Sequence, residues 1–164
     1  MPEGPEIKMS TDWLNRHCVG YEMKPVNCSG RYSSKPPEGY EAIQAAGHKE
    51  ILLVDCKGKF QYWALADDWY MWCTYGMSGQ WHSERLHDVT KHTALSLHLR
   101  KPEADVYMRF TDPRHFGTIK FVQGSAKMEK KLATLGPDML KQPSVEEFLD
   151  RLLRKPERTI AEAL

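Results

Sequence analysis

Two neighbouring segments of alternating hydrophobicity constrain the fold of this chain more than any other feature. They are TALSLHLRK, residues 93–101, and ADVYMRFT, residues 104–111. Their alternating apolar positions are Leu95, Leu97 and Leu99 in the first segment and Val106, Met108 and Phe110 in the second. A period of two places the apolar side chains of a strand on one face of a sheet. The two segments therefore predict a pair of half-buried β-strands, which Asp112-Pro113 ends.

Further short strands are predicted on both sides of this pair. Residues 48–65 indicate two strands around a tight Cys-Lys-Gly-Lys turn, residues 69–83 another strand with glycine punctuation, and residues 118–123 one more. Residues 19–43, rich in Gly, Pro and Ser, predict a short strand and a long loop, with a helical turn over 39–46. Many short strands linked by turns are typical of an antiparallel β-sandwich.

Helices are predicted at both ends of the chain. Residues 5–17 suit a helix with Pro5 in its first turn and Glu6 near the positive end of its dipole. Residues 125–136 and 144–155 have helical character, with a serine cap at Ser144, and residues 156–164 begin another helix. We therefore expect a mainly β protein with helices (α+β): an antiparallel β-sandwich domain over 1–124 that includes the N-terminal helix, and a helical segment over 125–164.

Composition sets limits on function. The 164 residues suit one domain or slightly more, and the net charge of +1 excludes a wholesale polycation. The four cysteines, Cys18, Cys28, Cys56 and Cys73, are scattered without a CxxC pair, so we expect reduced thiols and neither a disulfide framework nor a zinc site. No apolar run is long enough to cross a bilayer, and no signal peptide is present. We therefore predict an intracellular protein that is not bound to a membrane. The five tryptophans are expected to serve packing rather than base stacking.

The opening residues MPEGPE offer a nucleophile. Removal of Met1 would turn Pro2 into a free secondary amine, and an α-amine titrates near pH 8, far below a lysine. Such an amine can attack an electrophilic carbon to give an iminium ion, and Glu3 beside it can act as a general acid. The alternative is a polar N-terminus in which Pro5 simply starts a helix.

Three further motifs offer binding residues, and each also has a structural interpretation. Lys59 in KGKF can contact a phosphate or be a solvated turn lysine, and Met77 in GMSG can be a mobile probe or a core methionine. Arg114 and Phe116 in DPRHFG can supply a cation and an aromatic wedge for unstacking bases, or form a packed turn. Each signal is weak alone.

Taken together, the motifs resemble a known family. MPEGPE, GKF, GMSG, the Lys91-His92 step, DPRHFG and LGPDML occur in the order typical of the formamidopyrimidine-DNA glycosylase/endonuclease VIII family, and the match runs across the chain. Residues 29–43 and 54–60 look more like the endonuclease VIII-like branch than the bacterial 8-oxoguanine enzymes.

The resemblance implies a bifunctional DNA glycosylase and abasic-site lyase that acts in base excision repair as a monomer on damaged double-stranded DNA, without cofactor or metal. It implies that Pro2 forms a Schiff base at C1′, that Glu3 is the general acid and that Lys59 contacts the lesion's phosphate and sugar. It places Glu6 near the flipped lesion and His92 on the phosphate backbone. Met77, Arg114 and Phe116 would fill the space that the flipped base leaves.

The chain also departs from the family. Members continue into a helix–two-turn–helix segment, which holds a phosphate-gripping asparagine, and into a zinc or zincless finger, whereas this sequence stops at IAEAL. Residues 125–164 would then be the linker and the start of that segment. We expect weak DNA binding, because affinity depends on the number of phosphates neutralised. Two alternatives stay open: a non-catalytic damaged-DNA binding module or truncated remnant, and a β-sandwich interaction domain in which Pro2-Glu3 is accidental.

Overall fold

The strands of the protein form one continuous antiparallel path that bends into two halves. The computed structural model describes residues 2–24, 26–84 and 90–153. In these residues the strand order is β6-β8-β7-β1-β3-β4-β5-β9, with β2 beside β7. One half contains β6 (Gln80–Glu84), β8 (Ala104–Thr111), β7 (Thr93–Lys101), β1 (Glu22–Met23) and β2 (Asn27–Cys28). The other contains β3 (Lys49–Lys57), β4 (Phe60–Leu65), β5 (Trp69–Thr74) and β9 (Thr118–Gln123).

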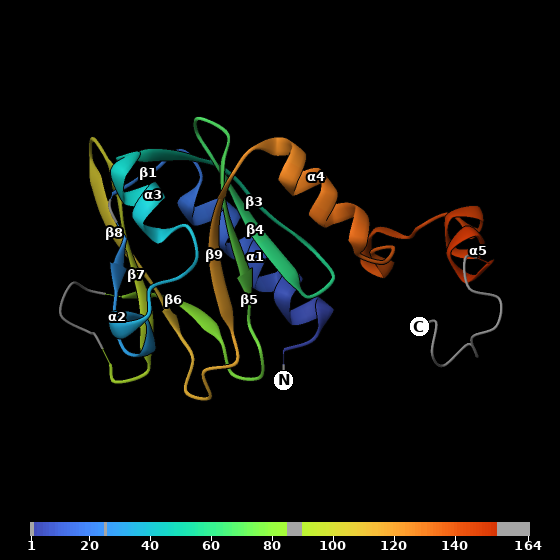
Figure 1. The fold of residues 1–164 in the computed structure, drawn as a ribbon, viewed down its shortest axis with the longest axis horizontal. Helices are drawn as coiled ribbons and strands as arrows, with labels where there is room; N and C mark the ends of the chain where they lie inside the picture. Colours follow the sequence, from blue (N-terminus) through green and yellow to red (C-terminus); the bar gives the residue numbers. More distant parts are fainter. Residues whose placement is uncertain (1, 25, 85–89, 154–164) are drawn as a thin grey trace.

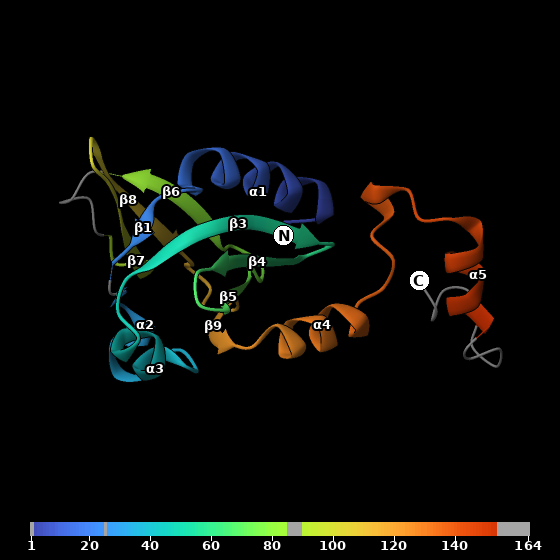
Figure 2. The ribbon, with the colours of Figure 1, turned by 90° about the horizontal axis from the view of Figure 1, so that it is seen from above.

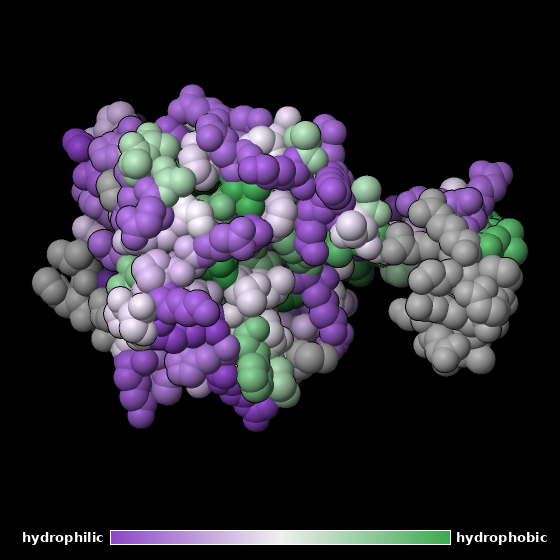
Figure 3. All heavy atoms as spheres, viewed as in Figure 1, coloured by the Kyte–Doolittle hydropathy of each residue, from purple (hydrophilic) through white to green (hydrophobic). Residues whose placement is uncertain are grey.

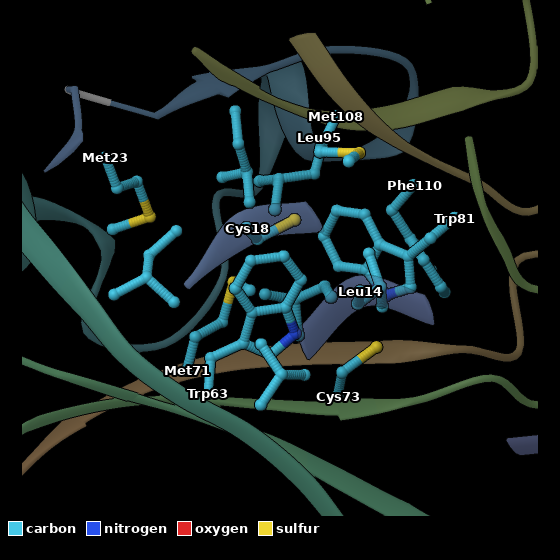
Figure 4. Packing of buried hydrophobic residues seen from close by; sticks show 14 of the residues in the cluster. Leu14, Cys18, Met23, Trp63, Met71, Cys73, Trp81, Leu95, Met108 and Phe110 are labelled. Carbon is cyan, nitrogen blue, oxygen red and sulfur yellow. The ribbon is translucent and has the colours of Figure 1, made fainter. Parts of the chain in front are cut away.

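The two halves face each other across the core, which confirms the predicted sandwich. The Trp63 ring of β4 lies 5.2 Å from the Trp81 ring of β6, although the two strands are far apart along the path. Figure 4 shows these rings packed with Leu14, Met71, Leu95 and Phe110. Trp63, Trp69 and Trp81 are buried and Trp13 and Trp72 are half-buried, so the tryptophans serve packing as expected.

The alternating segments are strands, as predicted. Leu95, Leu97 and Leu99 are fully buried, and Met108 and Phe110 of the partner strand lie against the same core. The prediction of a single strand over 69–83 was wrong, because the segment is two strands, β5 and β6. Gly76 between them has a φ of +57°, and a Cβ at Gly79 would lie 2.4 Å from the Tyr75 carbonyl oxygen. Only glycine fits this reversal.

Helix α1 (Gly4–Cys18) lies beside the sandwich, next to β3 and β6 (Figure 2). It buries Ile7, Leu14 and Cys18 in the same core as the strands. Asn15 Oδ1 accepts a hydrogen bond of 2.9 Å from the backbone nitrogen of Val54 in β3. The predicted helix over residues 5–17 is therefore confirmed, and the buried Ile7 near its start and Asn15 near its end hold it against the sheet.

Of the remaining helices, α3 (Tyr40–Ala45) and α4 (Ser125–Thr134) lie against β9 of the second half, α2 (Arg31–Ser34) lies against β7 of the first, and α5 (Val145–Leu153) stands apart from the sandwich (Figure 1). The segment before β3 contains α2 and α3, and Phe121 N of β9 donates to the Glu38 carbonyl just before α3. After β9 come α4, the 3₁₀ turn η1 (Met139–Lys141) and α5. Ser144 Oγ accepts from Glu147 N at 3.1 Å, as the predicted serine cap requires.

Two further expectations from the sequence concern helices. The helix predicted over 156–164 lies outside the described residues. In the parts of the chain that the structure describes, none of the helices is both long and apolar enough to span a membrane.

Candidate active site and nucleic-acid interface

Pro2 lies at the edge of a pocket of ≈ 350 Å³ formed where the start of α1 meets the β3–β4 turn and α4. Its lining includes Lys57, Lys59 and Lys131, with Phe60 and Tyr75 as aromatic wall. Three ammonium groups around one small pocket create a positive potential that attracts an anionic group such as a phosphate. The N-terminal residue proposed as nucleophile therefore faces a site suited to a phosphate-bearing ligand.

Glu3 and Lys59 meet beside this pocket. Lys59 Nζ lies 2.5 Å from Glu3 Oε2, and both side chains are about half exposed (51% each). Glu3 is also the N-cap of α1: its backbone nitrogen donates to Glu6 Oε2 at 2.9 Å, and its side chain accepts from the backbone of Glu6. This capping box fixes Glu3 and Glu6 at the helix start. An exposed ion pair contributes little to the free energy of unfolding. Its main effect is therefore to orient the Glu3 and Lys59 side chains beside the pocket.

Behind the pocket, the hydroxyl of Tyr75 belongs to a buried polar network that sequence reasoning missed. It pairs with Ser10 Oγ at 2.8 Å and accepts from Gln61 Nε2 at 2.8 Å. Gln61 Nε2 also donates to Thr11 Oγ1 at 2.8 Å. Burial raises the pKa of Tyr75, so the phenol stays neutral. The network ties α1, and with it Pro2, to β4 and to the residue that follows β5.

Met77, Arg114 and Phe116, predicted to fill the space that a flipped base leaves in DNA, come together on two adjacent loops. Met77 lies on the β5–β6 loop, while Arg114 and Phe116 lie on the β8–β9 loop, and Arg114 Nη1 donates to Met77 Sδ at 3.6 Å. Met77 is 41% and Phe116 61% exposed, which is unusual for large apolar side chains. Gly76 of the first loop also lines the Pro2 pocket, so the loops adjoin it; Figure 1 shows them at the edge where the N-terminus emerges.

A buried carboxylate joins the two loops. Asp112 is fully buried and accepts from Ser78 Oγ at 2.7 Å and from Gly117 N at 2.7 Å. Ser78 Oγ in turn accepts from Arg114 N at 3.0 Å. Arg31 Nη2 lies 3.8 Å from Asp112 Oδ2, and its guanidinium donates to the carbonyls of His115 and Gly117. Together these bonds fix the loop backbones and leave the tips of Met77, Arg114 and Phe116 exposed.

Sequence reasoning missed this network almost entirely. The Asp-Pro step and the serine between two glycines were visible signals for Asp112 and Ser78, but Arg31 had none. His92 lies at the same end of the sandwich, because its carbonyl accepts from Asp112 N at 2.9 Å. The structure thus brings Pro2, Glu3, Glu6 and Lys59 together at one place, and Met77, Arg114 and Phe116 at a neighbouring one, with His92 beside the second.

The cysteines and other potential ligands form no metal cluster in the described residues. No group of three His, Cys, Asp or Glu side chains there is arranged to hold an ion, and the four cysteines are free thiols. Burial raises the pKa of the Cys18 thiol to about 12, so it is unreactive at neutral pH.

Comparison with known proteins agrees with this arrangement. The family model described as formamidopyrimidine-DNA glycosylase N-terminal domain matches residues 1–119. The formamidopyrimidine-DNA glycosylase of Legionella pneumophila is 27% identical over 152 residues, covering 92% of this chain and 54% of that protein. That of Halorhodospira halophila is 29% identical over 142 residues, covering 85% and 51%. The chain therefore spans about half the length of these curated relatives.

Solved structures show the same fold. The complex of wild-type Lactococcus lactis Fpg (MutM) with DNA containing N7-benzyl-Fapy-dG matches with a TM-score of 0.69 and 21% identity, covering 80% of this chain and 48% of that one. The complex of the LlFpg protein with THF-DNA and an inhibitor matches equally well, at 22% identity. Because the family model covers most of its length, this chain belongs to the formamidopyrimidine-DNA glycosylase N-terminal domain family, a family of DNA repair glycosylases.

Proposed function

We propose that the protein is a bifunctional DNA glycosylase and abasic-site lyase that removes oxidised bases from double-stranded DNA. The observation that carries the proposal is the meeting of Pro2 and the Glu3–Lys59 pair at one cationic pocket, directly beside loops that present Met77 and Phe116 to solvent. A reacting pocket and a set of wedge residues at one edge are what base excision from a duplex needs.

Pro2, freed of Met1, supplies the nucleophile. Its nitrogen lone pair forms a bond to C1′ of the damaged nucleotide, and the C1′–base bond breaks with its electrons leaving on the base. Glu3 donates the proton that the departing base takes up. The C1′–O4′ bond then breaks as the nitrogen lone pair forms the iminium double bond, and O4′ takes up the proton that the proline nitrogen loses. The iminium withdraws electrons, so β- and then δ-elimination release the two phosphates of the lesion.

Other residues hold the DNA in place. Lys59 contacts the lesion's phosphate and sugar from its position beside Glu3. Phe116 and Met77 enter the space left by the flipped base, and Arg114 pairs with the orphaned partner base through its planar guanidinium. Extruding a base costs a few kcal/mol, which these contacts offset. Glu6 lies near the lesion, and His92 contacts the backbone.

The finer assignments belong to the same proposal. Residues 1–124 act as the catalytic domain, and residues 125–164 are a helical linker and the start of a helix–two-turn–helix domain. We also propose that the chain belongs to the endonuclease VIII-like branch and acts on oxidised pyrimidines or ring-opened purines. Rates on duplexes carrying one or the other lesion test this assignment and leave the chemistry of Pro2 untouched.

Borohydride trapping on a duplex with one abasic site tests the proposal. Mass spectrometry first confirms that Met1 is removed, and circular dichroism confirms the fold. The expected result is a covalent adduct that peptide mapping assigns to Pro2, and no adduct with an intact duplex. A folded, correctly processed chain that forms no adduct would overturn the lyase. Preferential binding of the abasic duplex without an adduct would instead identify a damaged-DNA binding module.

A further inference from the structure

A second groove lies on the outer face of the sheet, apart from the loops that carry Met77 and Phe116. It has a volume of ≈ 690 Å³ and lies between α3, β9 and α4. Its lining includes the half-buried ring of Trp72 and the edges of the buried rings of Trp69 and Phe121, with lysines around them. Figure 3 shows apolar side chains at the bottom of this hollow, with hydrophilic ones around it. An apolar floor with a charged rim is a feature of ligand-binding surfaces.

The rim is strongly cationic. Four lysines line the groove, Lys120, Lys127, Lys130 and Lys131, against a single carboxylate, Glu38. Glu38 is already paired with Lys120, at 2.7 Å. In the part of the chain that the structure describes, Lys127 and Lys130 have no carboxylate partner, and both are exposed. The positive charge of the rim therefore favours a ligand that carries several negative charges.

The groove and the Pro2 pocket are neighbours that share one lining residue. Lys131 lines both, and its Nζ lies 5.2 Å from the centre of the Phe60 ring, which faces the Pro2 pocket. The Phe60 ring meets the Trp72 ring edge-on at 5.7 Å, and Lys120 Nζ lies 5.5 Å from the Trp72 ring. Alternating cations and aromatic rings therefore lead from the Pro2 pocket into the second groove.

Two features favour a nucleic-acid strand over a peptide. The edge of β9 is already occupied, because Phe121 N donates to the Glu38 carbonyl at 2.8 Å, so a peptide has no free strand edge to pair with. Lysines along a groove with aromatic side chains are the combination that binds single-stranded nucleic acid. Lys127, Lys130 and Lys131 follow one face of α4 and can track successive phosphates.

We propose that this groove, which shares Lys131 with the Pro2 pocket, binds a single-stranded stretch of DNA that flanks the lesion. The inference rests on the proposed function for the identity of the strand, but the binding itself needs no catalysis. The strand leaves the Pro2 pocket past Lys131, sets a base against the half-buried ring of Trp72 and places its phosphates against Lys127 and Lys130. Substrates with a single-stranded flank, such as forks or gapped duplexes, are then bound more tightly than blunt ones.

The test uses two fluorescein-labelled duplexes with the same abasic-site analogue, one blunt and one with a ten-nucleotide single-stranded extension. We expect anisotropy titrations to show at least fivefold tighter binding of the extended duplex. The double variant Lys127→Gln/Lys130→Gln should lose this gain and keep its affinity for the blunt duplex. Its salt slope on the extended duplex should fall by about 1.4, or roughly 0.7 for each lost phosphate contact.

The matched control is Arg16→Gln/Arg100→Gln, which removes two exposed positive charges outside both grooves and should retain the gain. Equal affinity of the unchanged protein for the two duplexes would overturn the inference, as would a gain that survives in the lysine variant. The inference would also be overturned if poly-glutamate bound through Lys127 and Lys130 while the single-stranded extension did not bind there. Borohydride trapping of the same protein samples on a blunt duplex with a true abasic site, whose C1′ aldehyde can form a Schiff base, separates the cases. An adduct without a gain contradicts the groove alone, and a gain without an adduct contradicts the lyase alone.

Discussion

The Pro2 pocket and the wedge loops lie side by side but are built in different ways. At the pocket, Glu3 and Lys59 form an exposed ion pair on a helix cap and a tight turn. At the loops, the exposed tips depend on Asp112, a buried carboxylate that no solvent reaches. The first region thus places charged groups on the surface of a rigid helix and turn. In the second region, the buried Asp112 and its hydrogen bonds hold the loops in place.

This difference separates reactivity from stability. A change to an exposed group at the pocket removes chemistry and leaves the fold intact, because solvent replaces its contacts. A change to a buried polar group at the loops leaves other polar groups unpaired and costs stability. Three substitutions and a change of pH test this separation.

Glu3→Gln should slow release of an oxidised base about 100-fold, because the general acid is lost. The amide oxygen can still cap α1, so the free energy of unfolding should change by less than about 1 kcal/mol. Single-turnover base release and urea denaturation measure the two quantities. The adduct with an abasic site, where no base has to leave, should form within about tenfold of the normal rate. An equal loss on both substrates would contradict the role of Glu3 as the acid for the base.

Asp112→Ala should lower the free energy of unfolding by about 2 kcal/mol, because it leaves Ser78, Gly117 N and Arg31 without their buried acceptor. Asp112→Asn, which keeps one acceptor, should cost less. Urea denaturation measures both. The control is Asp105→Ala on β8, the strand that ends just before Asp112. Its carboxylate is 54% exposed and pairs with His98 at 3.2 Å, so the change should cost less than about 1 kcal/mol. Similar costs for the two alanine variants would remove the contrast between the regions.

Phe116→Ala should weaken the preference for an abasic over an intact duplex by about fivefold, or about 1 kcal/mol, because the wedge is shortened. Phe116 is largely exposed, so stability should stay within about 0.5 kcal/mol. Competition anisotropy with the two duplexes measures the preference. Phe116→Leu keeps an apolar wedge and serves as the control. If the alanine variant discriminates as well as the unchanged protein, Phe116 is not a wedge.

Alkaline pH should affect both regions together, since they share one core. A thiol ordinarily titrates near 9.0, whereas burial raises the pKa of Cys18 to about 12. As the pH rises through this interval the unfolded chain loses the proton and the folded one keeps it, so the free energy of unfolding falls. Urea midpoints at pH 8, 9 and 10 should decrease steadily, and Cys18→Ala should flatten the decrease. An identical slope in the variant would contradict the assignment.

Much of the fold was predictable because the signals are local. Alternation over a few residues is enough to place β7 and β8, and the proline and the acidic residue near the start are enough to place α1. The motifs also named the side chains that the structure gathers at one edge, although their roles stay predictions. The split of residues 69–83 into two strands was missed, because the close approach of Gly79 to the Tyr75 carbonyl is visible only in three dimensions.

What the sequence determined by itself is therefore the strand pattern, the helix at the N-terminus and the identity of the exposed candidate residues, all of which depend on neighbours in the chain. Tertiary structure alone decided that Arg31 reaches His115, 84 positions away, and that Lys131 lines two grooves. It also decided that Tyr75 shares a network with Ser10. A buried polar group requires a partner from wherever the fold brings one close, and that choice follows from packing rather than from local sequence.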